Sequence, residues 1–293
     1  MQKEEQGVVC KGKSLACFWK DINDSLLVGE NERVPYIRHD YDKPKWEAVG
    51  RILVKGFLEV SYFPTSLSKV FLTSCLFGES VVTEHMLMES FKAYLSKDEA
   101  KVVNQIVLKE VAAANDDVLE LLSNLDCKHK PCDSNLKEII LEIAQKELIQ
   151  KPQYVCNCWA SILSALQVYF PDVNALCSQY ESVIPTNSKV VHILKANPTC
   201  SAETDVLGYL KRYIRGLEPS KLSLFLRFTT GSDIMVTDTL HISFTSSEGF
   251  GRRPVAHTCG FTLELPSTYA NSCELREEFN NILSADNWEM DIV

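Results

Sequence analysis

Hydrophobic residues recur every three or four positions through the first two thirds of the chain, and this spacing predicts a series of amphipathic helices. Polar or turn-forming residues separate the segments, as expected where helices begin and end. The expected helices run from Lys45 to about Phe57, from Leu67 to Cys75, from Thr83 to Phe91, onward from Leu95, from Asn115 to Leu122, from Leu136 to Ile143, from Val155 to Leu166 and around Leu176. Asn135, with Glu138 three residues later, predicts a capping box for one of them.

The pattern changes in the last third. Two helices are expected at 203–215 and 220–228, followed by strands at 234–236 and 242–244. Residues 260–265 alternate strictly between apolar and polar side chains, which predicts a half-buried strand. A last helix is expected from Cys273 to Leu283, with its apolar residues at helical spacing. Together these segments predict an α+β fold.

Shifts in composition predict how the chain is divided. Residues 1–44 are polar and mixed, and we expect a poorly ordered lead-in there. Residues 45–197 are expected to form a mostly helical lobe, and residues 198–293 a small α+β lobe. The short polar stretch Asn197–Ser201 contains a proline, so it is the expected hinge between the two lobes.

Composition narrows the classes of partner. A formal charge of −9 argues against a nucleic-acid surface or an anionic membrane and suits a partner with a basic face. No apolar run approaches the roughly 18 residues that a membrane helix needs. Eleven cysteines, an odd number, without an apolar leader predict free thiols in a cytoplasmic or nuclear setting. The cysteine pairs 127/132 and 156/158 have spacers of four and one residues, unlike zinc sites, so neither a metal nor a cofactor is expected.

One thiol has the surroundings of a nucleophile. Cys259 ends the segment Pro-Val-Ala-His-Thr-Cys and precedes the alternating strand, a junction that can be reached from outside. In an extended segment His257 and Cys259 point to the same face, so His257 is a candidate to assist the thiolate. Thr258, with nearby backbone N–H groups, is a candidate for holding an oxyanion. Thr258 is equally well interpreted as a strand residue that is favoured there for its β-branching.

Three stretches of the last third carry a family resemblance. They are Leu222–Ser232 (Leu-Ser-Leu-Phe-Leu-Arg-Phe-Thr-Thr-Gly-Ser), Arg253–Cys259 (Arg-Pro-Val-Ala-His-Thr-Cys) and Leu263–Tyr269 (Leu-Glu-Leu-Pro-Ser-Thr-Tyr). In this order they resemble the C-lobe of HECT-type E3 ubiquitin ligases. Trp46–Leu53, Tyr62–Pro64 and Leu67–Ser68 are similar, more weakly, to the N-lobe of that family. The chain is most similar to divergent animal HECT-like proteins that end in Trp-Glu-Met-Asp, here Trp288–Asp291.

The resemblance implies a bilobal HECT-like fold and a ubiquitin-protein transferase. Cys259 would accept ubiquitin as a thioester from a charged E2 enzyme and pass it to a lysine of a protein substrate. Met290, four places from the end, and the nearby Trp288 would form a tail that supports transfer, although Trp288 is equally well interpreted as a packing residue. Arg252 and Arg253 are candidates for contacting ubiquitin, although a solvated turn is the default interpretation.

The chain also departs from the family pattern. The acidic Gly-Gly-Leu segment that usually opens the N-lobe is not found, so the N-lobe is expected to be shortened. Any E2-binding part would lie within Ser80–Leu136, where no family motif is recognised. The alternative function is therefore a catalytically inactive HECT-like module that binds ubiquitin or another partner. A stand-alone thiol hydrolase would need a Cys-His-Asn or Cys-His-Asp pattern that the chain does not offer.

Overall fold

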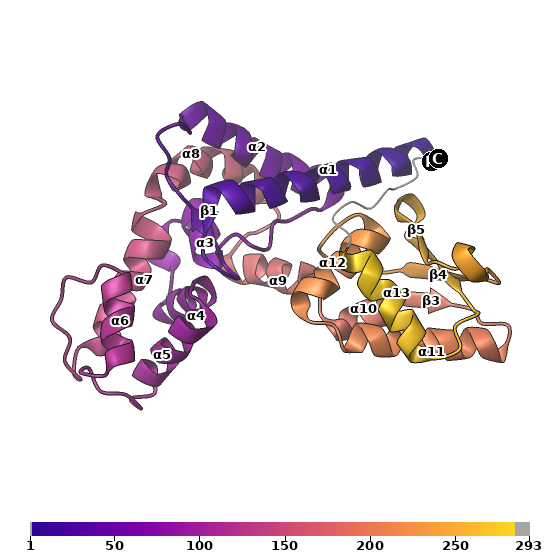
Figure 1. The fold of residues 1–293 in the computed structure, drawn as a ribbon. Coiled ribbons are helices and arrows are strands. Elements are labelled where there is room, and N and C mark those ends of the chain that lie inside the picture. The colour runs from indigo at the N-terminus through magenta and orange to yellow at the C-terminus, as the bar shows by residue number, and fades with distance from the viewer. Residues whose placement is uncertain (1, 285–293) are drawn as a thin grey trace. The chain divides into compact units, whose positions relative to one another are not determined.

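The structure, a computed structural model, describes residues 2–284 of the 293. It is mixed α and β, 61% helical with small sheets, so the predicted α+β class is confirmed. The described chain divides into two compact units. The helical unit comprises residues 19–55 and 64–180, and the mixed unit comprises residues 2–18, 56–63 and 181–284. Figure 1 shows the elements of both units by their labels.

The helical unit confirms most of the helices that the periodicity predicted. Its helices, some of which continue into the mixed unit, are α2 (Lys43–Val60), α3 (Lys69–Phe77), α4 (Glu84–Tyr94), α5 (Lys97–Val107), α6 (Asp116–Asn124), α7 (Leu136–Gln145), α8 (Gln153–Leu163) and α9 (Val173–Val183). Two short strands, β1 (Leu27–Val28) and β2 (Val34–Pro35), pair in antiparallel fashion. The Thr83 hydroxyl accepts a hydrogen bond from the Met86 N–H and caps α4, as an N-cap threonine commonly does.

An indole forms the centre of the helical unit. Trp159 on α8 is fully buried, and its Nε1–H donates to the backbone carbonyl of Trp46 on α2 at 2.7 Å. A Cβ added at Gly50 would lie 3.0 Å from the Trp159 ring, so only glycine lets α2 approach α8 this closely without displacing the ring. This contact is the physical reason for glycine at position 50.

The mixed unit holds a four-stranded sheet and the last helices. Its helices are α10 (Asn187–Ile193), α11 (Ser201–Arg215), α12 (Pro219–Thr230) and α13 (Ser272–Ser284), and its strands are β3 (Leu194–Ala196), β4 (Leu240–Thr245), β5 (Val255–His257) and β6 (Thr262–Pro266). The strand order is β3-β4-β6-β5, with β3 and β6 parallel to β4 and β5 antiparallel to β6. Parallel neighbours need long crossovers, and α11 with α12 supplies the one between β3 and β4.

Alternation along the strands separates the two faces of this sheet. Leu240, Ile242, Leu263 and Leu265 are buried and join a core with residues of α10 to α13. The residues between them are exposed or half-buried and form a polar face. The predicted half-buried strand at 260–265 is thereby confirmed as β6.

The expected lead-in is wrong in part, because residues 2–26 form helix α1 (Gln2–Leu26). Trp19, Ile22 and Leu26 are buried at helical spacing, so tertiary packing stabilises a helix that looks polar in sequence. The division between the compact units falls after residue 180 rather than after 197. The reason is that α10 and β3 are packed into the core of the mixed unit and its sheet.

Two local expectations are also wrong. Residues 234–236 form no strand; Met235 makes a single backbone hydrogen bond, to the Val183 carbonyl, instead of joining a ladder. Asn135 precedes α7, but its side chain accepts from the Cys132 N–H rather than capping the helix. The capping box lies instead at Ser96 and Glu99, which open α5.

A half-buried carboxyl gives the mixed unit a testable pH dependence. The Tyr62 hydroxyl donates to Asp233 Oδ1 at 3.2 Å, and burial raises the pKa of Asp233 above its ordinary value. Between the ordinary and the raised pKa the folded chain binds more protons than the unfolded one, so stability falls as pH rises through that window. The variant Asp233→Asn keeps an acceptor for Tyr62 but cannot ionise. We expect its free energy of unfolding to fall less than that of the wild type between pH 3.5 and pH 6.5.

Urea unfolding of both proteins across that range measures the difference directly. Carboxyls elsewhere in the chain titrate in both proteins, so the wild type minus variant difference isolates Asp233. Equal slopes in the two proteins would contradict the expectation.

Candidate functional site

The thiol of Cys259 lies in the turn that joins the edge strand β5 to its neighbour β6. β5 ends at His257, and residues Thr258–Gly260 form a single 3-10 turn before β6 begins at Thr262. Cys259 is exposed, unlike the buried thiols of Cys75, Cys156 and Cys158 in the helical unit. Exposure at a turn is what a thiol needs in order to react with a group on another protein.

The turn is anchored on both sides. Phe261 adopts a left-handed backbone conformation with φ of 45°, unusual for a bulky residue, and its N–H reaches back to the Thr258 carbonyl. The Phe261 carbonyl accepts from the His241 N–H of β4 at 2.8 Å, and its half-buried ring packs against the core. A left-handed residue of this kind persists where surrounding contacts hold it, so the position of the Cys259 backbone is fixed by neighbours in the sheet.

The expected extended backbone at Cys259 is wrong. The chain leaves the strand conformation after His257, so the rule that residues two apart share a face does not apply to His257 and Cys259. His257 pairs instead with Glu264 on β6, with 3.1 Å between Nε2 and Oε1. Thr258 is half-buried, and its carbonyl closes the turn.

The register places several polar groups on the open face beside the turn. His241, Thr262 and His257 are partners across three adjacent strands, and in the next row Ser243 pairs with Glu264. Sequence reasoning missed Glu264 as a neighbour of His257. The alternation of β6 did place it on the polar face, but its pairing with His257 depends on the tight return of the chain at residues 258–261.

The two arginines expected to contact ubiquitin differ in their surroundings. The Arg252 guanidinium pairs with Glu274 of α13 at 2.9 Å and lies 4.9 Å from the centre of the Tyr269 ring. The Tyr269 hydroxyl donates in turn to Glu278 at 2.7 Å, and burial raises the pKa of Tyr269. Arg252 therefore ties the loop before β5 to α13, whereas Arg253 is exposed. A contact with ubiquitin stays a prediction for both.

Helix α12 lies against β5 and the turn that carries Cys259. It ends in the resemblance motif, where Gly231 adopts the left-handed conformation of a C-cap and its N–H reaches the Arg227 carbonyl. The Thr230 hydroxyl donates to the Leu226 carbonyl and accepts from the Ser232 N–H, and both side chains are buried. The motif therefore stabilises the end of the helix that packs against the Cys259 turn, and its buried side chains are not part of the reactive surface.

A comparison with known protein families finds a match to part of the chain. The family model described as HECT-domain (ubiquitin-transferase) matches residues 172–288. This part of the chain is HECT-like. None of the curated proteins compared with the chain matches it.

The HECT-like region starts at the beginning of α9 and includes the whole four-stranded sheet and the Cys259 turn. The resemblance of this part of the chain to a HECT-type E3 ligase is therefore confirmed. HECT domains interact with E2 enzymes and with ubiquitin. The expected tail residues Trp288 and Met290 lie outside the described residues.

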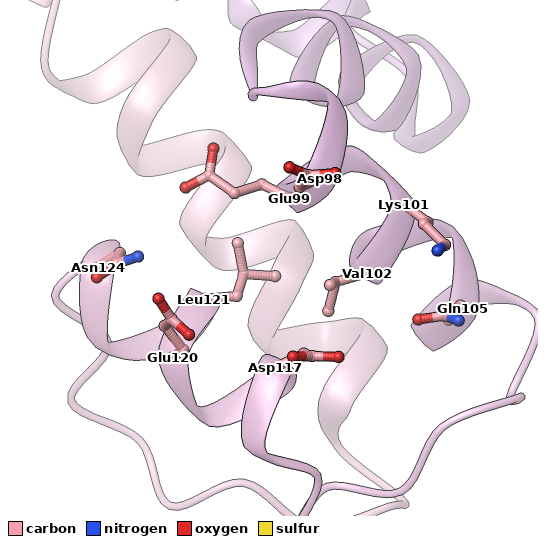
Figure 2. Close-up of a pocket in the computed structure, with 9 residues that line it drawn as sticks. All are labelled: Asp98, Glu99, Lys101, Val102, Gln105, Asp117, Glu120, Leu121 and Asn124. Carbon is pink, nitrogen blue, oxygen red and sulfur yellow. The ribbon is translucent and has the colours of Figure 1, made fainter.

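The helical unit contributes two cavities within the range where E2 docking was expected. One, of about 330 Å³, lies between α5 and α6 and is shown in Figure 2. Its floor includes Val102 and the buried Leu121, and its rim is mostly acidic, with Asp98, Asp117 and Glu120. A second cavity of about 740 Å³ lies between the start of α4, the end of α5 and the start of α7.

Neither a metal site nor a membrane segment is found in residues 2–284. In that range no three histidine, cysteine or acidic side chains are placed to hold a metal ion. Across the same residues, every helix is too short or too polar to cross a membrane.

Proposed function

We propose that the chain transfers ubiquitin through a thioester on Cys259, accepting it from a charged E2 enzyme and passing it to a substrate lysine. The observation that carries the proposal is the exposed thiol at the tip of an anchored turn within the HECT-like region. Cytoplasmic or nuclear action fits the ten cysteines whose side chains the structure describes, because none of these forms a disulfide.

The chemistry suits a cysteine. The Cys259 thiolate attacks the carbonyl carbon of the E2-bound thioester, the new C–S bond forms, and the E2 thiolate leaves with the electron pair of the old bond. Attack by a thiolate on a thioester replaces one thioester with another, so reactant and product differ little in free energy. The half-buried Thr258 and the backbone of the turn are candidates for stabilising the oxyanion that forms between the two steps.

We place the E2 enzyme on the α4–α7 part of the helical unit. The cavity between α5 and α6 is lined by two apolar side chains and by four acidic side chains against one basic side chain, Lys101. This balance of charge suits a partner with a basic face. Val107, Leu108 and Leu119 are exposed large apolar side chains in the same part of the chain, and such residues are common at protein interfaces.

The alternative is an inactive HECT-like module that binds ubiquitin or another partner without forming a thioester. One experiment separates the two functions. The protein is incubated with ubiquitin, an activating enzyme, a panel of E2 enzymes and ATP, and is then run on gels with and without a thiol reductant. An adduct of one ubiquitin that disappears with reductant supports transfer. No adduct with any E2, together with binding of ubiquitin in a calorimetric titration, supports the binding module.

A further inference from the structure

The polar face of the sheet pairs a carboxylate with an imidazole beside the proposed nucleophile. Glu264 Oε1 and His257 Nε2 are 3.1 Å apart, and both side chains remain partly exposed, at 40% and 52%. His257 precedes Cys259 by two residues, so their Cα atoms lie within about 7 Å of each other. The pair therefore lies within a short distance of the thiol along the backbone.

The pairing fixes how the imidazole is used. When the ring is neutral, Nε2–H donates to the carboxylate and Nδ1 keeps a free lone pair. When the ring is protonated, the same contact becomes an ion pair that stabilises the positive charge. A carboxylate that orients an imidazole in this way is the arrangement by which many enzymes hold a general base.

Transfer to lysine needs such a base. A lysine amine with a pKa near 10.4 is neutral in only about one molecule in a thousand at neutral pH, and only the neutral amine attacks. Attack forms the C–N bond, the C–S bond breaks, and its electron pair returns to the Cys259 sulfur. The balanced reaction converts a thioester and an ammonium group into an amide, a thiol and one released proton.

Resting on the proposed function, we propose that His257 accepts this proton from the incoming lysine and that Glu264 is the positioning residue that orients His257. His257 then passes the proton to water. The carboxylate also gives the exposed face of β6 a negative charge that attracts the lysine ammonium group. The site thus selects a primary amine of high pKa as acceptor.

The test uses the full chain, loaded with ubiquitin on Cys259 and separated from the E2 enzyme. Discharge of the thioester is followed by non-reducing gel after addition of either free lysine or hydroxylamine. Hydroxylamine is already neutral at the assay pH and needs no base to generate its nucleophilic form. A defect in folding or in access to Cys259 therefore slows both reactions. Loss of the base slows only the reaction with lysine. The variants are Glu264→Gln, His257→Gln and the double variant. The matched control is Glu277→Gln, which removes the same charge from an exposed position of α13.

We expect Glu264→Gln to slow discharge to lysine by about tenfold or more and to leave discharge to hydroxylamine unchanged. Glu264 only orients the base, so its loss should cost less than the roughly 10²–10⁴-fold that general base catalysis contributes. Because the two residues act as one unit, the double variant should be no slower than His257→Gln alone. Glu277→Gln should match the wild type with both amines.

Three results would overturn the inference. Discharge of Glu264→Gln to lysine at the wild-type rate, or equal slowing with both amines, removes the role of Glu264 while leaving the thioester intact. Failure of the wild-type chain to form any thioester removes the proposed function itself, and this inference with it. Loading is measured before discharge, so the two kinds of failure are distinguished in one experiment.

Discussion

Replacing Cys259 by alanine is expected to abolish the reductant-sensitive ubiquitin adduct completely. The adduct is a covalent bond to one sulfur, and alanine supplies no nucleophile that could replace it. The thiol is exposed at the tip of its turn, so its loss removes few packing contacts and the fold should be retained. Non-reducing gels of the loading reaction measure the adduct, and circular dichroism of the same samples checks the fold.

Two control thiols make this expectation specific. Cys200 and Cys273 are exposed cysteines of the same mixed unit, so alanine at either position should leave the adduct at the wild-type level. Cys259→Ser should give, at most, a slowly formed ester that survives thiol reductant, because an alkoxide forms less readily than a thiolate. An adduct that persists in Cys259→Ala, or that disappears in Cys273→Ala, would place the acceptor elsewhere.

Phe279→Ala is expected to cause the largest loss of stability among single changes in the mixed unit. Phe279 on α13 is fully buried, and its ring centre lies 5.3 Å from that of Tyr213 and 5.8 Å from that of Phe225. Truncation of a buried phenylalanine to alanine costs about 3–5 kcal/mol, a large share of the roughly 5–15 kcal/mol that stabilises a typical fold. For a unit of this size, the unfolding midpoint should fall by about 10–20 °C.

Thermal unfolding followed by circular dichroism measures this shift. Glu277→Ala, two residues earlier on the exposed side of the same helix, should change stability by no more than about 0.5 kcal/mol. Phe279→Leu keeps most of the apolar volume and should lie between the two. Equal midpoints for Phe279→Ala and Glu277→Ala would show that α13 does not contribute to the core as its burial indicates.

Most of the helices could be predicted because their signals are local. Apolar residues at helical spacing marked α2 to α9 and α11 to α13, and residues such as Thr83 marked where a helix begins. The signals failed where a distant partner decides the structure. Residues 2–26 look polar, yet packing of Trp19 and its neighbours makes them helical. Residues 234–236 have the composition of a strand but no neighbouring strand to pair with.

For the candidate site, too, some features followed from the local sequence and others from contacts between distant residues. The order of residues in the chain placed Cys259 two positions after His257 and before a half-buried strand, which made this thiol the candidate nucleophile. Which side chains meet was not available from that order. The left-handed backbone of Phe261 turns the chain after Thr258, moves Cys259 out of the strand and brings Glu264 to His257.

The sequence by itself determined the helical segments and the α+β class and singled out Cys259 as the candidate thiol, because each depends on residues close together in the chain. Only the tertiary structure decided that α10 and β3 belong with the sheet, that Arg252 is held by Glu274, and that the partner of His257 is Glu264. These contacts join residues that are distant in sequence or related through strand register. A one-residue change of register would reverse which side chains share a face, so no local pattern could have fixed them.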